Sequence, residues 1–241
     1  AEATAITEIA RRAGNGPTAE RFARIAADLG DNIRRRLWNK DIEFFTSLSV
    51  SGGQDDVREL HGYAPFYFGM DLGRPFAGAW KYLMDESGFL APKGLTFPAR
   101  NTPGFDLTFD PVRHECLWNG PSWPYATSIA MTALYGALQG RDAGTLPVNA
   151  DDFVKLLHQY AAQHVRERED GRAVAWIDEN LDPITGEWLA RKAMIEWDRL
   201  GMRKLAIRER GKDYNHSTFC DLVIAGLCGF VPQADGGITV R

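Results

Sequence analysis

The feature that most constrains the fold is the spacing of apolar residues near the N-terminus, which is typical of a helical hairpin. Residues 2–13 are rich in alanine and favour a helix, and the sequence GNGP then interrupts it, with Pro17 suited to a first helical turn. In residues 18–38 the apolar side chains recur at steps of three and four, at Phe22, Ile25, Ala26, Leu29, Ile33 and Leu37. The pattern predicts two helices packed side by side.

Two further helix pairs follow along the chain. Residues 72–84 pair with 121–138, and residues 151–165 pair with 217–228. The segments 89–119 and 167–215 between the partners are far longer than the usual connection in a helical bundle, and such loops are functional or disordered. They contain many Trp, Phe, Asp and Glu residues, which a disordered linker would lack. We therefore expect an all-α scaffold with its site on long loops, and with strand-like pieces such as EFFTSLSV limited to small β-hairpins.

Composition excludes several classes of function. With 241 residues, 44% hydrophobic and 25% charged, the chain is long enough for one large domain. No apolar run is long enough to span a membrane, and a net charge of -4 with interspersed signs gives no basic stripe for nucleic acid. The sequence has no metal-ligand spacing, phosphate-binding glycine loop or dinucleotide fingerprint, so we expect no metal or cofactor. We expect its three cysteines, Cys116, Cys220 and Cys228, to be isolated buried thiols.

The stretch ECLWNGPSWPYATSIAMTALYGAL places an aromatic collar, residues 118–125, directly before a helix of small apolar residues. Proline and glycine stiffen and turn the backbone there, which would fix the rings at the start of the helix. Flat rings suit the apolar face of a sugar, and neighbouring amide and hydroxyl groups suit its hydroxyls. The candidate binding residues are Trp118, Asn119 and Trp123. Packing at a helix junction explains the tryptophans equally well.

The stretch AWIDENLDPITGEW, residues 175–188, is a second candidate site, and we call it the acidic turn. It contains Asp178, Glu179, Asp182 and Glu187 between Trp176 and Trp188, around a Pro-Gly turn. Hydrolysis of a glycosidic bond needs one protonated and one ionised carboxyl group, and a neighbouring indole can raise the pKa of a carboxyl by desolvation. The alternative is an acidic turn on the surface.

Near the C-terminus, KDYNHSTFCDLVIAGLCGF starts a helix in which Asn215 can act as the N-cap and His216 lies in the first turn. His216 suits a hydroxyl or a carboxylate, although a lone histidine is more often structural.

Together, CLWNGPSWPYATS, ENLDPITGEW and DYNHSTFCDLVIAGLCGF resemble, in this order, the C-terminal part of bacterial mannosylglycerate-hydrolase-like glycoside hydrolases, which are related to glycoside hydrolase family 63 and more distantly to trehalases. HGYAPFYFGM is similar to the Gly-Tyr-Ala-Pro-Phe segment of the same family, and the opening AEATAITEIARRAGN to the helix before it. The resemblance extends over most of the chain.

The resemblance implies an (α/α)6 toroid, a ring of six helical hairpins with its active site where the long loops meet. The family's catalytic base is the Glu of a Glu-Asn-Tyr-Asp-Pro-x-Thr-Gly motif and falls on Glu179, with Leu181 in place of the aromatic residue; Glu187 is the reserve candidate. The family's general acid lies in an upstream Glu-Ser-Gly-x-Asp segment. The sequence DESGFLAPKG lacks the required Asp and lies after the Ala-Pro-Phe segment, so we expect residues 1–241 to be one helical domain, the C-terminal portion of a longer catalytic domain.

The first hypothesis is therefore an inverting hydrolase of an α-linked glycoside that needs no cofactor. In it Glu179 activates water, and Trp118, Trp123 and Trp176 shape the sugar site. The groups expected to hold hydroxyls or an anionic aglycone are Asn119, Arg100, Tyr214 and His216; a surface ion pair is the alternative for Arg100. The second hypothesis is a carbohydrate-binding domain without turnover. The third is a sugar isomerase or epimerase on the same toroid, which would rely on the loop histidines His61, His114 and His216.

Overall fold

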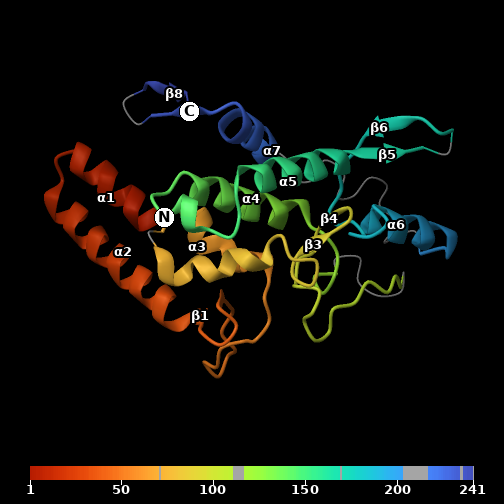
Figure 1. Cartoon of the computed structure of the whole chain (residues 1–241), viewed down its shortest axis with the longest axis horizontal. Helices are drawn as coiled ribbons and strands as arrows, with labels where there is room; N and C mark the ends of the chain where they lie inside the picture. The colour runs from red at the N-terminus through yellow and green to blue at the C-terminus, as the bar shows by residue number, and fades with distance from the viewer. Residues whose placement is uncertain (71, 111–116, 169, 203–216, 234–235, 241) are drawn as a thin grey trace.

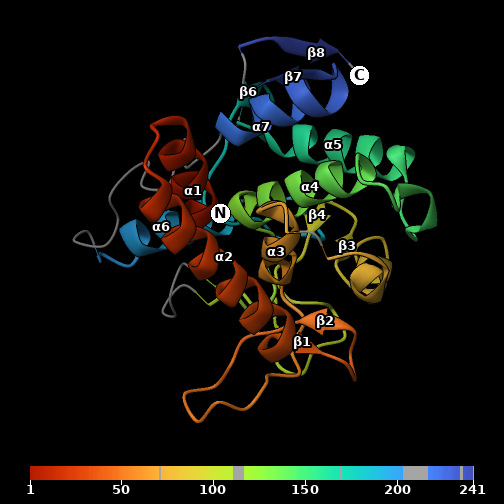
Figure 2. The same ribbon diagram turned by 90° about the vertical axis from the view of Figure 1, so that its left-hand side faces the viewer.

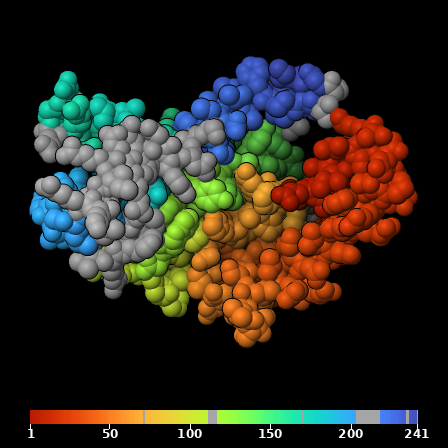
Figure 3. Space-filling model, turned by 180° about the vertical axis from the view of Figure 1, so that it is seen from behind, coloured from red at the N-terminus to blue at the C-terminus, as the bar shows by residue number. Residues whose placement is uncertain are grey.

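A computed structural model describes residues 1–70, 72–110, 117–168, 170–202, 217–233 and 236–240. Helices dominate, and the only sheets among these residues are two-stranded antiparallel hairpins (Figure 1). No helix in these ranges is both long and apolar enough to cross a membrane. The helix α1–α2 pair lies at one end of the molecule, and the β5–β6 hairpin and helix α6 lie at the other (Figures 1 and 3).

The predicted N-terminal hairpin is confirmed. Helix α1 (Glu2–Arg12) packs along helix α2 (Gly16–Arg36), and Gly14, with a φ of 71°, makes the turn between them. The Asn15 side chain caps α2 by accepting a hydrogen bond from the Thr18 N–H. The apolar stripe of α2 is mostly half-buried, and Leu29 remains 54% exposed.

An aromatic core follows. Strands β1 (Trp38–Asn39) and β2 (Phe44–Phe45) form a small hairpin of the kind expected for EFFTSLSV. The chain continues through η1 (Leu60–Tyr63), α3 (Ala64–Tyr67) and η2 (Arg74–Tyr82). Tyr63 stacks on Trp80 with their ring centroids 4.7 Å apart, and Phe44 and Phe89 pack around them. These rings anchor the segment that leads into the candidate site.

The predicted helix at residues 72–84 is wrong in type and in partner. Residues Arg74–Tyr82 form a 3₁₀ helix, and Gly78 within it disfavours an α-helix. Helix α4 (Pro124–Leu138) packs mainly on η1 and α3 instead. The buried Gly62 lets η1 approach β2 closely, because a Cβ at that position would collide with Phe44 and with the Phe45 carbonyl group.

Helix α4 is the centre of the fold, and its first three turns are buried on nearly every side. Helix α5 (Ala150–Gln163), which begins with a capping box between Asn149 and Asp152, packs on α4, and the short η3 (Ala143–Thr145) joins the two. The Tyr160 hydroxyl group hydrogen bonds with Ser128 Oγ at 2.9 Å and donates to the Pro124 carbonyl at 3.1 Å. Helix α5 is thereby tied to the first turn of α4.

The predicted C-terminal helix is confirmed as helical, but it changes type. It consists of α7 (Ser217–Asp221) and a π-helical stretch, η4 (Leu222–Leu227), that lies over α4 and α5 (Figure 2). Phe219 packs against Tyr160 of α5 and against His164, the residue that follows α5. Cys220 and Cys228 are exposed, so the expectation of buried thiols is wrong for both: they lie on the outer side of this helix. Cys116 lies outside the described residues.

Several elements were not predicted. Helix α6 (Leu189–Arg199) lies inside the segment read as a long loop, and buries Ala193, Met194 and Trp197 in a small cluster of their own. The remaining hairpins pair β3 (Leu90–Ala91) with β4 (Gly94–Leu95), β5 (Val165–Glu167) with β6 (Ala173–Ala175), and β7 (Phe230–Pro232) with β8 (Ile238–Val240). Where the structure describes the long connections, they therefore contain short, structured pieces.

Candidate active site

The aromatic collar has a buried layer and an exposed layer. Trp123 is 2% exposed, and its indole N–H donates to the Leu117 carbonyl at 2.8 Å. Trp118 stacks on it with the two planes within 8° and the ring centroids 3.7 Å apart, and is 37% exposed. Trp123 is thus the support, and Trp118 is the ring that solvent can reach.

The backbone of the collar is held by its neighbours. The Phe97 N–H donates to the Pro121 carbonyl, and the Asp106 N–H donates to the Asn119 carbonyl. A Cβ at Gly120 would collide with the Asp106 carbonyl group, so glycine is required for this close approach. Trp123 is extended, with φ and ψ of -117° and 118°, and Pro124 then starts α4.

The acidic turn is a tight, hydrogen-bonded loop. Asp182 Oδ1 accepts hydrogen bonds from the Ile184 and Thr185 N–H groups, and the Asp182 N–H donates to the Glu187 carbonyl. Gly186, with a φ of 84°, closes the turn. The Lys93 N–H donates to the Pro183 carbonyl and so ties the turn to the β3–β4 hairpin.

The collar and the acidic turn are joined by an antiparallel bridge. The Ser122 N–H donates to the Leu181 carbonyl at 2.8 Å, and the Leu181 N–H donates to the Ser122 carbonyl at 2.9 Å. Because the two segments run in opposite directions, the residues just before Leu181 lie beside those just after Ser122. Glu179 is therefore on the same side of the bridge as Trp123 and the start of α4.

Glu179 differs from the residues around it. From Trp176 to Leu181 all the residues except Glu179 are buried, and Asp178 and Asn180 have no exposed surface at all. Asn180 Oδ1 accepts a hydrogen bond from the Ala190 N–H in the first turn of α6, and Asp178 Oδ1 accepts one from the Glu179 N–H. These two buried anchors leave Glu179 as the partly exposed carboxylate of the segment.

Burial raises the pKa of Asp178 to about 6. The hydrogen bond from the Glu179 N–H, the neighbouring Trp176 indole and the Arg191 guanidinium lower this pKa, whereas the charge of Glu179 raises it. Burial outweighs the groups that favour the ionised form. A titratable carboxyl with an altered pKa therefore lies directly beside Glu179, as often found in active sites.

Glu187, the reserve candidate, lies on the outer arm of the turn. Its side chain is 55% exposed, and its carboxylate pairs with Lys192 Nζ at 2.8 Å. The contact between Glu187 and Lys192 is therefore an ordinary surface ion pair.

The other predicted residues fall in different places. Trp176 is 7% exposed, with the Arg166 and Arg191 guanidinium groups 4.9 Å and 5.6 Å from its ring centroid, so little of its ring is accessible. Asn119 is exposed at the collar. Arg100 Nη1 donates to the Glu86 carbonyl at 2.8 Å and to the Leu90 carbonyl at 3.4 Å, which makes it a brace for that turn. Tyr214 and His216 lie outside the described residues.

His61 belongs to the same surface, although the sequence analysis gave it no role in hydrolysis. Its ring centroid lies 4.8 Å from that of Phe97, 6.0 Å from that of Trp118 and 5.9 Å from that of Tyr125. We call the three exposed rings His61, Trp118 and Tyr125 the ring platform; the buried Phe97 and Trp123 lie beneath it. The HGYAPF segment was the only sequence signal for this residue.

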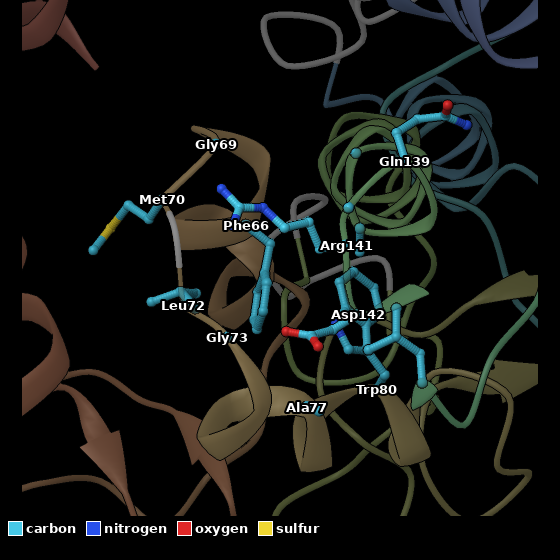
Figure 4. Close-up of a pocket in the computed structure, with 14 residues that line it drawn as sticks. Phe66, Gly69, Met70, Leu72, Gly73, Ala77, Trp80, Gln139, Arg141 and Asp142 are labelled. Carbon is cyan, nitrogen blue, oxygen red and sulfur yellow. The ribbon is translucent and has the colours of Figure 1, made fainter. Parts of the chain in front are cut away.

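A separate cavity of about 640 Å³ lies at the C-terminal end of α4. Gln139 and Asp142 lie on one side of it, and Met70 and Leu72 on the other (Figure 4). Since α4 has 15 residues and rises 1.5 Å per residue, this cavity is about 22 Å along the helix from the collar. No group of three or more potential metal ligands occurs among the residues that the structure describes.

Comparison with known proteins finds one family and two solved structures to which the chain is similar. Residues 1–217 match the family of mannosylglycerate hydrolase MGH1-like glycoside hydrolase domains. A solved structure named sialidase is 31% identical and superposes with a TM-score of 0.79 over 99% of this chain, which spans 20% of that protein. A second, an uncharacterized conserved protein from Thermus thermophilus, is 20% identical with a TM-score of 0.50, over 78% of this chain and 42% of its own length. No curated protein matches.

Proposed function

Because the chain belongs to the MGH1-like glycoside hydrolase family, we propose that it forms part of an enzyme that hydrolyses an α-linked glycoside with inversion. Glu179 is the general base in this proposal, and the general acid comes from outside residues 1–241. The observation that carries the proposal is the Ser122–Leu181 bridge, which holds the acidic turn against the aromatic collar. The bridge brings a partly exposed carboxylate and an exposed indole to one end of α4.

In the reaction, the ionised carboxylate of Glu179 takes a proton from water as the oxygen attacks the anomeric carbon. The acid on the opposite face protonates the leaving oxygen, and an inverting enzyme keeps the two carboxyl groups about 6.5–9.5 Å apart to make room for the water. Trp118 offers its exposed face to the apolar side of the sugar ring. The exposed Asn119 is positioned to bind hydroxyls at the edge of the collar.

Glu179 is favoured over Glu187 as the base because of their environments. A base must reach substrate, and Glu187 is instead engaged with Lys192 on the outer arm of the turn. The residues on both sides of Glu179, Asp178 and Asn180, are buried and hydrogen-bonded, which holds the backbone that carries its side chain. Such support is what a catalytic group requires for positioning.

We also propose that residues 1–241 are one domain that contributes part of an (α/α)6 ring. The α1–α2 hairpin and the central α4 and α5 helices supply helices of the expected kind. The candidate site lies at the N-terminal end of α4, where the collar, the acidic turn and η1 meet. Convergence of loops at one end of the helices is typical of a toroidal glycosidase.

A carbohydrate-binding domain without turnover is the second candidate. It is favoured by the ring platform, which can bind sugar whether or not an acid is present. The two candidates make the same prediction for sugar binding and opposite predictions for product release.

The test is to incubate the full-length protein with α-mannosides and α-glucosides and to follow the released sugar by ¹H NMR. The proposed function predicts that the β-anomer appears first and then mutarotates, and that Glu179→Gln abolishes release while retaining sugar binding. Glu187→Gln is the matched control and should behave as the unaltered protein. First appearance of the α-anomer would contradict inversion, and binding with no release by the unaltered protein would favour the second candidate.

A further inference from the structure

Another cavity, of about 460 Å³, lies where the C-terminal end of α2 and strand β1 meet the turn from Leu48 to Gln54. None of the described residues that line it belongs to the collar, the acidic turn or the ring platform. Figure 1 shows β1 beside the end of α2, and α6, which follows the acidic turn, on the opposite side of the molecule. The volume is within the range of about 300–1,000 Å³ that is usual for small-molecule sites. The cavity therefore has room for a sugar ring, away from the candidate active site.

The walls of this cavity are held by contacts within the chain. Gln54 Nε2 donates to the Arg36 carbonyl at 2.8 Å and to the Trp38 carbonyl at 2.9 Å, which ties the turn to the end of α2. The half-buried Trp38 ring, which lines the cavity, has its centroid 4.9 Å from that of Phe45 and 4.9 Å from that of Phe76. Both contacts are edge-to-face, so the indole is fixed in the wall.

Three exposed cations, Arg35, Arg36 and Lys40, line the cavity. Arg35 donates to the neutral amide oxygen of Asn32 at 2.8 Å. In the part of the chain that the structure describes, the side chains of Arg36 and Lys40 have neither an ion pair nor a hydrogen bond. Basic residues at the end of a helix often bind its last carbonyl groups, but here Gln54 already donates to the Arg36 carbonyl. The positive charges are therefore not neutralised by a carboxylate and remain available to a ligand.

The negative groups near the cavity are fewer. Asp41 is the one acidic residue among the described residues that line it, and the C-terminal end of α2 adds roughly half a negative charge. Asp55 and Asp56 lie close by in the sequence but do not line the cavity, and Asp55 Oδ1 accepts a hydrogen bond from the Val57 N–H at 3.1 Å. The three cations exceed these charges, so the cavity is positive although the chain has a net charge of -4.

We propose that this cavity is a second carbohydrate-binding site, which takes a sugar unit that carries a carboxylate or sulfate group. The cations bind the anionic group, since hydrogen bonds between ionised partners are the strong ones. Trp38 offers apolar surface to the sugar ring. The choice of a sugar rests on the proposed function, whereas the choice of an anion follows from the charges alone. The site would bind an acidic glycan away from the bond that is cleaved.

The test measures binding by calorimetry in the full-length protein with Glu179→Gln, so that no glycoside is consumed. The probes are methyl α-glucoside, its 6-sulfate, methyl α-glucuronide and inorganic sulfate. Both charged glycosides should bind at least about fivefold more tightly than methyl α-glucoside, the gain from one ion pair near a surface, and the preference should shrink as sodium chloride is added. The 6-sulfate should also bind more tightly than inorganic sulfate. Adding Trp118→Ala, which removes the exposed ring of the collar, should preserve both preferences.

Further variants locate the effect. Arg36→Gln and Lys40→Gln should each weaken binding of the charged glycosides about fivefold. Arg24→Gln is the matched control, because it removes the same charge from an exposed position of α2 about 18 Å along the helix from Arg36, and it should leave these affinities unchanged. Asp41→Asn should strengthen binding of the charged glycosides about fivefold by removing a like charge. A loss of folding cannot produce this gain.

Equal binding of the charged and neutral glycosides would overturn the proposal, and so would a preference that Arg36→Gln and Lys40→Gln leave unchanged. Binding of inorganic sulfate as tight as that of the 6-sulfate would overturn the role of the sugar ring. Failure of the proposed function has a different signature. In that case the preference for charged glycosides persists, but the protein with Glu179 intact releases no sugar from any α-glycoside.

Discussion

Each arm of the acidic turn carries a glutamate close to a tryptophan, but the surroundings of the two glutamates differ. On the inner arm, Glu179 lies between Asp178 and Asn180, which have no exposed surface, and the arm is bridged to the collar through Leu181. On the outer arm, the exposed Glu187 pairs with Lys192. Both glutamates are within three residues of a tryptophan. Proximity to an indole in the sequence therefore does not distinguish the two glutamates. They differ in the contacts of their arms, because the inner arm is bridged to the collar and the outer arm carries an exposed ion pair.

The collar repeats this contrast on a smaller scale. Trp118 and Trp123 stack on each other, but one is exposed and the other is core. The two explanations considered for the tryptophans, sugar binding and packing, thus need not compete: packing describes Trp123, and sugar binding remains a proposal for Trp118.

The largest expected effect is on catalysis and separates the two glutamates. Glu179→Ala should lower kcat by about 10³-fold, within the usual contribution of a general base, because water is then no longer deprotonated as it attacks. Added azide, a small nucleophile that needs no base, should restore part of the rate. Glu187→Ala should leave kcat within about twofold. Steady-state kinetics on an α-glycoside provides the measurement. Equal decreases in kcat for the two variants would contradict the different roles of Glu179 and Glu187.

The next effect separates the two tryptophans. Trp123→Ala should lower the free energy of unfolding by about 3–5 kcal/mol, because it empties a buried site. Trp118→Ala should cost about 1 kcal/mol, mostly the lost stacking, yet should weaken sugar binding more than any stability change explains. Urea unfolding and calorimetric sugar titration of both variants test this pair. Equal decreases in the free energy of unfolding of the two variants would contradict the assignment of Trp123 as a buried support and Trp118 as a surface ring.

The third effect concerns the buried anchor beside Glu179. Because the pKa of Asp178 is raised from 3.8 to about 6, the folded state holds a proton there that the unfolded state has lost, and stability falls as pH rises from about 4 to 6. At one pKa unit per 1.36 kcal/mol, this loss is at most about 3 kcal/mol. Asp178→Asn should remove it, since the amide oxygen still accepts from the Glu179 N–H.

The measurement is urea unfolding of the Asp178→Asn and unaltered proteins at a series of pH values between 4 and 7. The free energy of unfolding of the variant minus that of the unaltered protein should rise between pH 4 and 6 and then level off above pH 6. Glu59, whose pKa is also raised, is present in both proteins and cancels in the difference. A difference that does not change with pH would contradict a buried, protonated Asp178.

The smallest effect is at the base of α4. Tyr160→Phe should cost about 1 kcal/mol of unfolding free energy, because it removes the hydroxyl group that bonds to Ser128 and Pro124, while Ser128 keeps its own bond to the Pro124 carbonyl. A loss several times larger, measured by thermal unfolding, would mean that the helix supporting the collar depends on this one contact.

The positions of the regular helices could be predicted from the sequence, whereas the types of the irregular helices could not. Helices α2 and α5 have side-chain N-caps and regular apolar spacing, so their bounds follow from local rules. The 3₁₀ segment Arg74–Tyr82 and the π-helical Leu222–Leu227 depend on tertiary packing, and α6 was hidden in a segment whose acidic turn suggested a loop. The spacing of apolar residues alone does not predict whether a segment forms a 3₁₀ helix, a π-helix or an α-helix.

For the candidate site, the motif order predicted which segments form it, and this stays a prediction; it could not predict which side chains are accessible. The bridge between Ser122 and Leu181 joins two segments far apart in the chain, and no local pattern contains it. His61 was missed as a member of the ring platform for the same reason, since its neighbours Trp118 and Tyr125 come from a different part of the sequence.

The most direct test of the central claim is a crystal structure of the full-length Glu179→Gln protein with an uncleaved α-glycoside bound. The account predicts that the sugar ring stacks on Trp118 and that one water molecule fits between its anomeric carbon and the side chain of residue 179. A sugar bound elsewhere, or bound at Trp118 with residue 179 directed away from it, would contradict the claim that collar and acidic turn form one site.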